Sequence, residues 1–189
     1  MTGSWIRDMS ERLASWLPRR VRQFGASRRA ATAIEFAIIA PILTGLLISV
    51  LETGVFFLAQ QNLQDAAIQG GRLIMTGQAQ TGGMTQSQFL AAVCPELQTL
   101  FTCANVMADV QTAASFSSAT TAPPTLTYNA NGTVSNNWNY NLGTDGGIVV
   151  VRLIYQWPLV SGPFSLLLPN LTNGTSLMYG VSAFKVEPY

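Results

Sequence analysis

A long apolar run dominates the first third of the sequence. From Phe36 to Leu51, sixteen consecutive residues carry no charge. As a helix these residues span about 24 Å at 1.5 Å per residue, slightly less than a hydrocarbon core of roughly 30 Å. The shortfall disappears if the helix continues through Glu52 to Ala59. We therefore predict a transmembrane helix over residues 31–59, with Glu52 as a charge near the outer membrane edge.

Charged residues are divided unevenly around this run. Residues 1–30 hold seven arginines and two acids, whereas residues 31–189 hold three basic and seven acidic side chains. An excess of arginine beside a membrane segment marks its cytoplasmic side. We therefore predict that residues 1–30 form a basic cytoplasmic leader whose amphipathic spacing suits an anionic lipid surface. This interpretation is favoured over a nucleic-acid-binding arm, and a disordered cytoplasmic tail stays open as the alternative.

A cleaved secretory signal is the competing interpretation of a basic segment followed by an apolar run. The basic segment is thirty residues long, however, and no small-x-small cleavage site follows Leu51. Helical spacing also persists beyond the run, at Leu63, Ala66, Ala67, Gly70, Leu73 and Ile74. The helix is therefore expected to continue over residues 60–78, with Gly77 as its stop.

One carboxylate, Glu35, lies at the start of the apolar run. On insertion scales a carboxylate near mid-bilayer costs about 2.5 to 3.5 kcal/mol and is tolerated only with a partner or near an interface. Glu35 therefore either lies among the cytoplasmic headgroups close to Arg28 and Arg29, or pairs with a charge on another chain. The residue pattern alone leaves both open.

Residues 79–189 are expected to form a small outer α+β domain. Thr85-x-x-Gln88 resembles a capping box that opens a short helix, and Pro95 suits the first turn of another. Alternating apolar residues predict strands at 105–111, 147–160 and 175–186. A short antiparallel sheet packed on the long helix is the simplest arrangement that buries the apolar faces of both.

The segment between the first two predicted strands is rich in Ser, Thr, Asn and Gly, with Trp138 and Tyr140 embedded in it. A loop as long as residues 114–146 in a small domain is usually a flexible tip or an interaction surface. We predict a flexible loop here.

Two cysteines, Cys94 and Cys103, are the candidate metal or redox residues. Four zinc ligands cannot be assembled because the chain has no histidine and no further cysteine. In an oxidising outer compartment the two should instead form a disulfide. No nucleophile elbow, phosphate loop or carboxylate pair occurs, and the usual catalytic triad needs a histidine. We therefore expect neither an enzyme nor a metal or cofactor.

Several segments, taken together, resemble one family. They are RRAATAIEFAIIAPIL, LAQQNLQDAAIQGGR, the cysteine pair ahead of a strand, IVVVRLIYQWPLV and the ending SAFKVEPY. This combination resembles the TadE-like proteins of the bacterial tight-adherence (Flp) pilus machinery. The resemblance implies a pilin-like fold and a minor pilin or pseudopilin in the inner membrane, with the N-terminus cytoplasmic and the outer domain periplasmic or extracellular.

The resemblance also implies roles for residues at the head of the helix. A prepilin peptidase would cut between Ala30 and Ala31, which makes Glu35, followed by Phe36, the fifth residue of the processed chain. Glu35 would then pair with the new amine of an adjacent subunit and fix the axial stagger. The family usually has Gly before the junction, where this chain has Ala30. An uncleaved, membrane-bound assembly component is therefore the alternative.

Two functions compete at this point. The first is support of pilus assembly in adhesion and biofilm formation, with other pilins, pilus assembly proteins and inner-membrane lipids as partners and no nucleic acid. The second is a bitopic envelope protein whose outer domain binds a ligand or surface through the aromatic loop.

Overall fold

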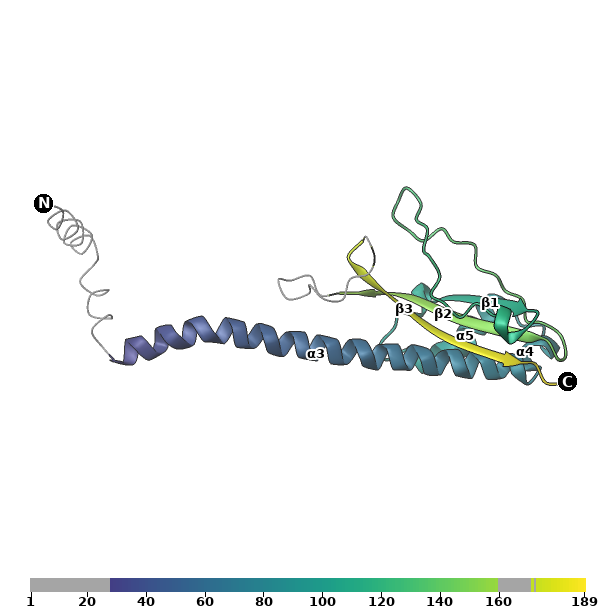
Figure 1. Ribbon diagram of the computed structural model, residues 1–189, viewed down its shortest axis with the longest axis horizontal. Coiled ribbons are helices and arrows are strands. Elements are labelled where there is room, and N and C mark those ends of the chain that lie inside the picture. The colour runs from purple at the N-terminus through teal and green to yellow at the C-terminus, as the bar shows by residue number, and fades with distance from the viewer. Residues whose placement is uncertain (1–27, 160–170, 172) are drawn as a thin grey trace, which may run out of the picture. The chain divides into compact units, whose positions relative to one another are not determined.

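The computed structural model describes residues 28–159, 171 and 173–189 (Figure 1). Its elements are α3 (Arg28–Met75), α4 (Gln78–Thr81), α5 (Gln86–Leu97), β1 (Met107–Ala113), β2 (Ile148–Pro158) and β3 (Thr175–Lys185), with 3-10 turns at Cys103–Asn105 and Phe116–Ser118. A long apolar helix followed by a three-stranded antiparallel sheet confirms the predicted α+β class. Most of the predicted basic leader, residues 1–27, lies outside the described residues.

Within the described residues, the chain divides between Ser49 and Val50 into two units. Helix α3 contributes to both. In the second unit its C-terminal part packs on the sheet through small and apolar side chains, which are Ala59, Leu63, Ala66, Ala67 and Ile74. These residues recur at three- and four-residue steps, so they share one face of the helix.

Helix α3 ends where the sequence predicts. Gly77 follows it with a left-handed φ of 73°, a conformation that glycine adopts at no steric cost. A Cβ at this position would also lie 2.4 Å from the Tyr189 ring. The backbone N–H of Glu187 donates to the Met75 carbonyl over 2.9 Å, so the segment after β3 closes over the end of the helix.

The sheet has the order β1-β2-β3, and both pairings are antiparallel. The helix-facing residues of β2 are Val149, Val151, Leu153 and Tyr155, which lie in the buried core with the apolar side chains of α3 and α5. The predicted strands therefore agree with the observed ones to within a few residues. In Figure 1, β3 runs alongside the C-terminal part of α3.

Two glutamines of α3 hydrogen-bond the outer edge of β3. The Gln60 amide donates to the Tyr179 carbonyl over 2.8 Å, and the Gln64 amide donates to the Val181 carbonyl over 2.7 Å. The Gln64 carbonyl also accepts from the Val181 N–H over 3.0 Å. An edge strand normally presents unpaired backbone groups, so these side chains take the place of a neighbouring strand.

Helix α5 begins with the predicted capping box, since Thr85 and Gln88 each accept the other's backbone N–H. The prediction that Pro95 opens a separate helix is wrong, because Pro95 lies inside α5. Its missing N–H leaves only the Ala91 carbonyl without a helical donor. Ala91 is exposed to water, which can supply the missing hydrogen bond.

The central part of the sheet face turned away from the helices is also buried. On it Asp109, Val150, Arg152 and Ile154 are each at most 7% exposed. At Asp109 and Arg152 the sheet is therefore covered on both sides. The physical reason is that the long segment between β1 and β2 covers this face.

Hydrogen bonds hold that covering segment to the sheet. Arg152 donates to the Ala122 carbonyl over 3.4 Å, and the Gln156 amide donates to the Tyr128 hydroxyl over 2.7 Å. Further along this segment, the Asn139 carbonyl accepts from the Val110 N–H, and the Asn141 N–H donates to the Val110 carbonyl in β1. The predicted loop of residues 114–146 thus serves as a third layer, while its flexibility stays a prediction.

Candidate functional site

The N-terminal part of α3 exposes large apolar side chains in every direction. Those at least 45% exposed are Ile34, Phe36, Ile38, Ile39, Ile42, Leu43, Leu46, Leu47, Ile48, Val50, Leu51, Val55, Phe57 and Leu58. Successive helical residues point about 100° apart, so adjacent members such as Leu46, Leu47 and Ile48 face three different directions. A helix that is apolar all round belongs in lipid or among other apolar helices. It is long and apolar enough to cross a membrane once.

Glu35 interrupts this apolar surface near its beginning. It lies between Ile34 and Phe36, which are 58% and 71% exposed, and its own side chain is exposed. Within the described residues its carboxylate has no hydrogen bond or ion pair. Ile34 and Phe36 favour an apolar surrounding, and in such a surrounding the unpaired carboxylate of Glu35 would be costly.

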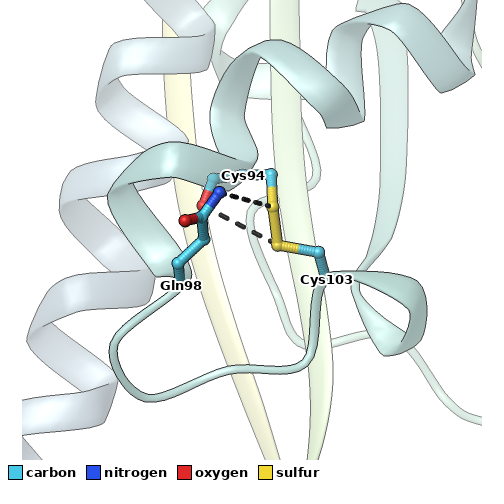
Figure 2. The surroundings of a disulfide bond; sticks show 3 residues. All are labelled: Cys94, Gln98 and Cys103. Atoms are coloured by element: carbon cyan, nitrogen blue, oxygen red, sulfur yellow. Dashed lines mark hydrogen bonds between the residues drawn. A yellow bond between two sulfur atoms is a disulfide. The ribbon is translucent and has the colours of Figure 1, made fainter.

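The predicted disulfide between Cys94 and Cys103 is confirmed (Figure 2). Its Cα atoms lie 5.8 Å apart, and it joins the last turns of α5 to the 3-10 turn that precedes β1. The two cysteines line a small hollow together with Leu90, Val93, Leu97 and Val106. The Gln98 amide donates to Cys94 Sγ over 3.9 Å. The crosslink therefore fixes the path of the chain from the helix layer into the sheet.

Replacing both cysteines with alanine should lower the free energy of unfolding by about 2 to 4 kcal/mol, since the crosslink restricts the unfolded chain. Denaturant unfolding of the full chain in detergent would measure the change. Gln98→Ala is the matched control, because it removes the contact to sulfur and keeps the crosslink. Equal stability of the double variant and the native chain would contradict this expectation.

The apolar helix and its carboxylate lie within a segment that other proteins share. Residues 30–72 match the family model of TadE-like protein. This segment is similar to TadE-like proteins and is called the TadE-like segment. Searches of curated proteins and of solved structures gave no match. The family is pilin-type and generally non-enzymatic, and it suggests association with the Tad pilus machinery.

The TadE-like segment includes both residues of the predicted processing junction. Ala30 and Ala31 belong to α3, and cleavage between them stays a prediction. The segment also includes Glu52, whose side chain is partly buried. Its place at the outer membrane edge stays a prediction too. The family match ends at residue 72, so the resemblance of the later strand and of the ending stays a prediction as well.

Outside the TadE-like segment, the titratable side chain that stands out among the described residues is the phenol of Tyr140. No group of three or more His, Cys, Asp or Glu gathers around a possible metal position in the part of the chain that the structure describes. Tyr140 turns its ring toward Phe89, with the centroids 5.9 Å apart, and buries its hydroxyl. This burial raises the pKa of Tyr140 to about 12. The phenol is therefore protonated at neutral pH.

Sequence reasoning missed one buried ion pair. Asp109 and Arg152 are Cα partners in the β1–β2 register, and Arg152 donates to Asp109 Oδ2 through both Nε and Nη2. The Asp109 carboxylate also accepts from the Gln111 amide over 3.0 Å and from the Asn139 N–H over 2.9 Å. The signal was one basic residue in the apolar stretch IVVVRLIYQW and one acid in the preceding strand.

Proposed function

We propose that the protein is a minor pilin or pseudopilin-like membrane protein that supports assembly of a tight-adherence pilus. The main support is the N-terminal part of α3, which exposes apolar side chains on all sides and has one carboxylate, Glu35, near its start. This part of the helix lies within the TadE-like segment. Pilus assembly needs a helix that can leave lipid and pack among other apolar helices. A surface without a polar face suits both surroundings.

The charge distribution supports the orientation of this proposal. The arginine-rich residues 1–30 stay in the cytoplasm, and residues 79–189 lie on the outer side of the inner membrane. The disulfide supports an oxidising outer compartment, because such crosslinks are rare in the cytosol. The partners are other pilins and pilus assembly proteins, and the outer domain carries no enzymatic role.

We assign subunit registration to Glu35. Cleavage by a prepilin peptidase between Ala30 and Ala31 creates a positive amine, which is costly in an apolar bundle unless a carboxylate neutralises it. Glu35 of the adjacent subunit supplies that carboxylate and sets the axial offset between helices. N-terminal sequencing of the membrane-extracted protein decides whether the amine is that of Ala31. An uncleaved chain would act as a membrane-bound assembly component.

Replacing Glu35 with glutamine should abolish most piliation while the protein stays in the membrane. The amide keeps the shape and loses the charge, which leaves a buried amine unpaired at a cost of about 3 to 5 kcal/mol per contact. Counting surface pili by electron microscopy, alongside membrane levels of the protein, measures this effect.

Asp65→Asn is the matched control for that experiment. Asp65 is an exposed carboxylate on the same helix, hydrogen-bonded only locally to Gln61 among the described residues, so its replacement should leave piliation normal. Normal piliation in Glu35→Gln, with the protein present in the membrane, would falsify the registration role.

A ligand-binding bitopic protein is less well supported. That function needs the aromatic residues of the loop to be free for a partner. Tyr140 instead packs against Phe89 in the core, and Trp138 is partly buried. Exchanging residues 30–59 for an unrelated membrane helix separates the two functions, because only a ligand-binding protein would keep its activity.

A further inference from the structure

We propose that one end of the sheet rests on the membrane, so that the outer domain touches the lipid headgroups of the outer leaflet. The contact surface, called the sheet-end surface, consists of Phe57 and Leu58 of α3 with Trp157, Pro158 and Leu159 at the end of β2. The proposal rests on the membrane-spanning helix of the proposed function, and adds a second lipid contact made by the domain itself.

The hydrogen bonds between α3 and β3 establish which residues lie at the same level. Gln60 bonds to Tyr179 and Gln64 bonds to Val181, so the helix and the strand run in the same direction. Two strand residues rise about 6.6 Å and four helical residues about 6 Å, which agrees with this alignment. The start of β3 therefore lies beside the part of α3 that precedes Gln60.

The same alignment places Trp157 beside the apolar part of the helix. Trp157 pairs with Ser176, three residues before Tyr179. Three strand residues rise about 10 Å, equal to roughly six or seven helical residues. Trp157 is thus level with about residues 53–54 of α3, and Phe56 joins it in packing against the core.

The surface of α3 changes from apolar to polar just beyond this level. Phe57 and Leu58 are 65% and 59% exposed. The next exposed residues toward the C-terminus include Gln61, Asp65, Gln69 and Arg72, with Ile68 the exposed large apolar side chain among them. A membrane boundary at the level of Leu58 therefore brings the end of β2 to the lipid surface.

Aromatic side chains gather at this end of the sheet. The ring centroid of Phe101 lies 4.9 Å from that of Tyr155 and 5.6 Å from that of Trp157. Tryptophan and tyrosine are enriched where proteins meet the headgroup region, because their rings are apolar with a polar edge. Trp157 is only partly buried by this cluster, so part of its ring can contact lipid.

The end of the sheet near Trp157 has no charged side chains on its strands, and charged residues lie at the opposite end, as a contact with lipid requires. From Leu153 to Pro158 in β2 and from Thr175 to Phe184 in β3, the strands that form the sheet end carry no charged residue. Lys185 and Glu187 lie at the opposite end, where Glu187 bonds to Met75. Glu52 is the one carboxylate of α3 close to the level of Trp157, and an interface lets it keep contact with water.

Tryptophan fluorescence of the full chain in vesicles tests the contact. The vesicles contain phosphatidylethanolamine and phosphatidylglycerol with some lipids brominated near the headgroup end of their acyl chains. One variant keeps only Trp157 by replacing Trp5, Trp16 and Trp138 with phenylalanine. A matched variant keeps only Trp138, whose neighbour Asn139 bonds to Asp109, five positions or about 16 Å up the sheet from Trp157.

We expect brominated lipid to quench most of the Trp157 emission and to leave that of Trp138 nearly unchanged. Adding Leu159→Glu to the Trp157-only variant should restore most of the emission, because a carboxylate at the sheet end avoids lipid. Circular dichroism and an intact disulfide verify that each variant folds.

A reference variant separates failure of this proposal from failure of the proposed function. It carries Phe57→Trp with all four native tryptophans replaced by phenylalanine. Absence of quenching there means that the helix is not in the bilayer, which overturns both. Quenching of Phe57→Trp, with Trp157 and Trp138 quenched equally, overturns the lipid contact of the domain alone.

Discussion

Replacing Arg152 with methionine should lower the free energy of unfolding by about 3 to 5 kcal/mol, because it leaves the buried Asp109 carboxylate without its charged partner. The two residues are 7% and 2% exposed, so water cannot solvate the remaining charge without opening the covering segment. The Gln111 and Asn139 contacts compensate only part of the charge. Denaturant unfolding in detergent, followed by tryptophan fluorescence, measures the effect.

The double variant Asp109→Leu/Arg152→Met is the control for that prediction. It removes both charges and fills the space with apolar atoms, an exchange that is often neutral for buried pairs. Most of the lost stability should therefore return, less the contributions of the hydrogen bonds to Ala122 and Asn139. A single variant as stable as the native chain would show that the pair is solvated in solution.

Replacing Gly180 with valine should destabilise the outer domain by about 3 kcal/mol or more, the upper range for overpacked sites. A Cβ at Gly180 would lie 2.4 Å from the Leu63 carbonyl oxygen. Gly180 lies in β3 and Leu63 in α3, so neither backbone can shift locally without disturbing its strand or helix. Relief of this clash requires β3 to move away from α3, which would also break the Gln60 and Gln64 hydrogen bonds. Thermal unfolding of the full chain measures the loss.

Gly54→Ala provides the comparison for Gly180. A Cβ at Gly54 meets nothing within 4 Å, and alanine favours helix over glycine by roughly 1 kcal/mol. This variant should therefore unfold at the native temperature or slightly above it. Equal effects of Gly54→Ala and Gly180→Val would contradict the close approach of helix and strand.

Local features of the sequence predicted much of the fold. The capping box at Thr85 and the helix stop at Gly77 were both found, because caps and stops depend on residues only a few positions away. The three strands were found because alternation of apolar residues is also a local pattern. The disulfide followed from composition, since two cysteines without histidine have few other stable uses in an oxidising compartment.

The candidate site could be predicted in part for the same reason. The uncharged run from Phe36 to Leu51 and the carboxylate at Glu35 are adjacent in the chain, so the sequence displays the apolar helix and its one interruption directly. The Asp109–Arg152 pair was missed because its members are 43 positions apart. Only the strand register makes them neighbours.

The sequence by itself therefore determined the apolar helix, its caps and stops, the approximate strands and the cysteine pairing. The tertiary structure decided that residues 114–147 cover the outer face of the sheet and that Gln60 and Gln64 replace a missing strand beside β3. It also decided that an ion pair is buried between these layers. The physical reason is distance along the chain: each of these contacts joins segments brought together only when the layers pack, which no local pattern of residues records.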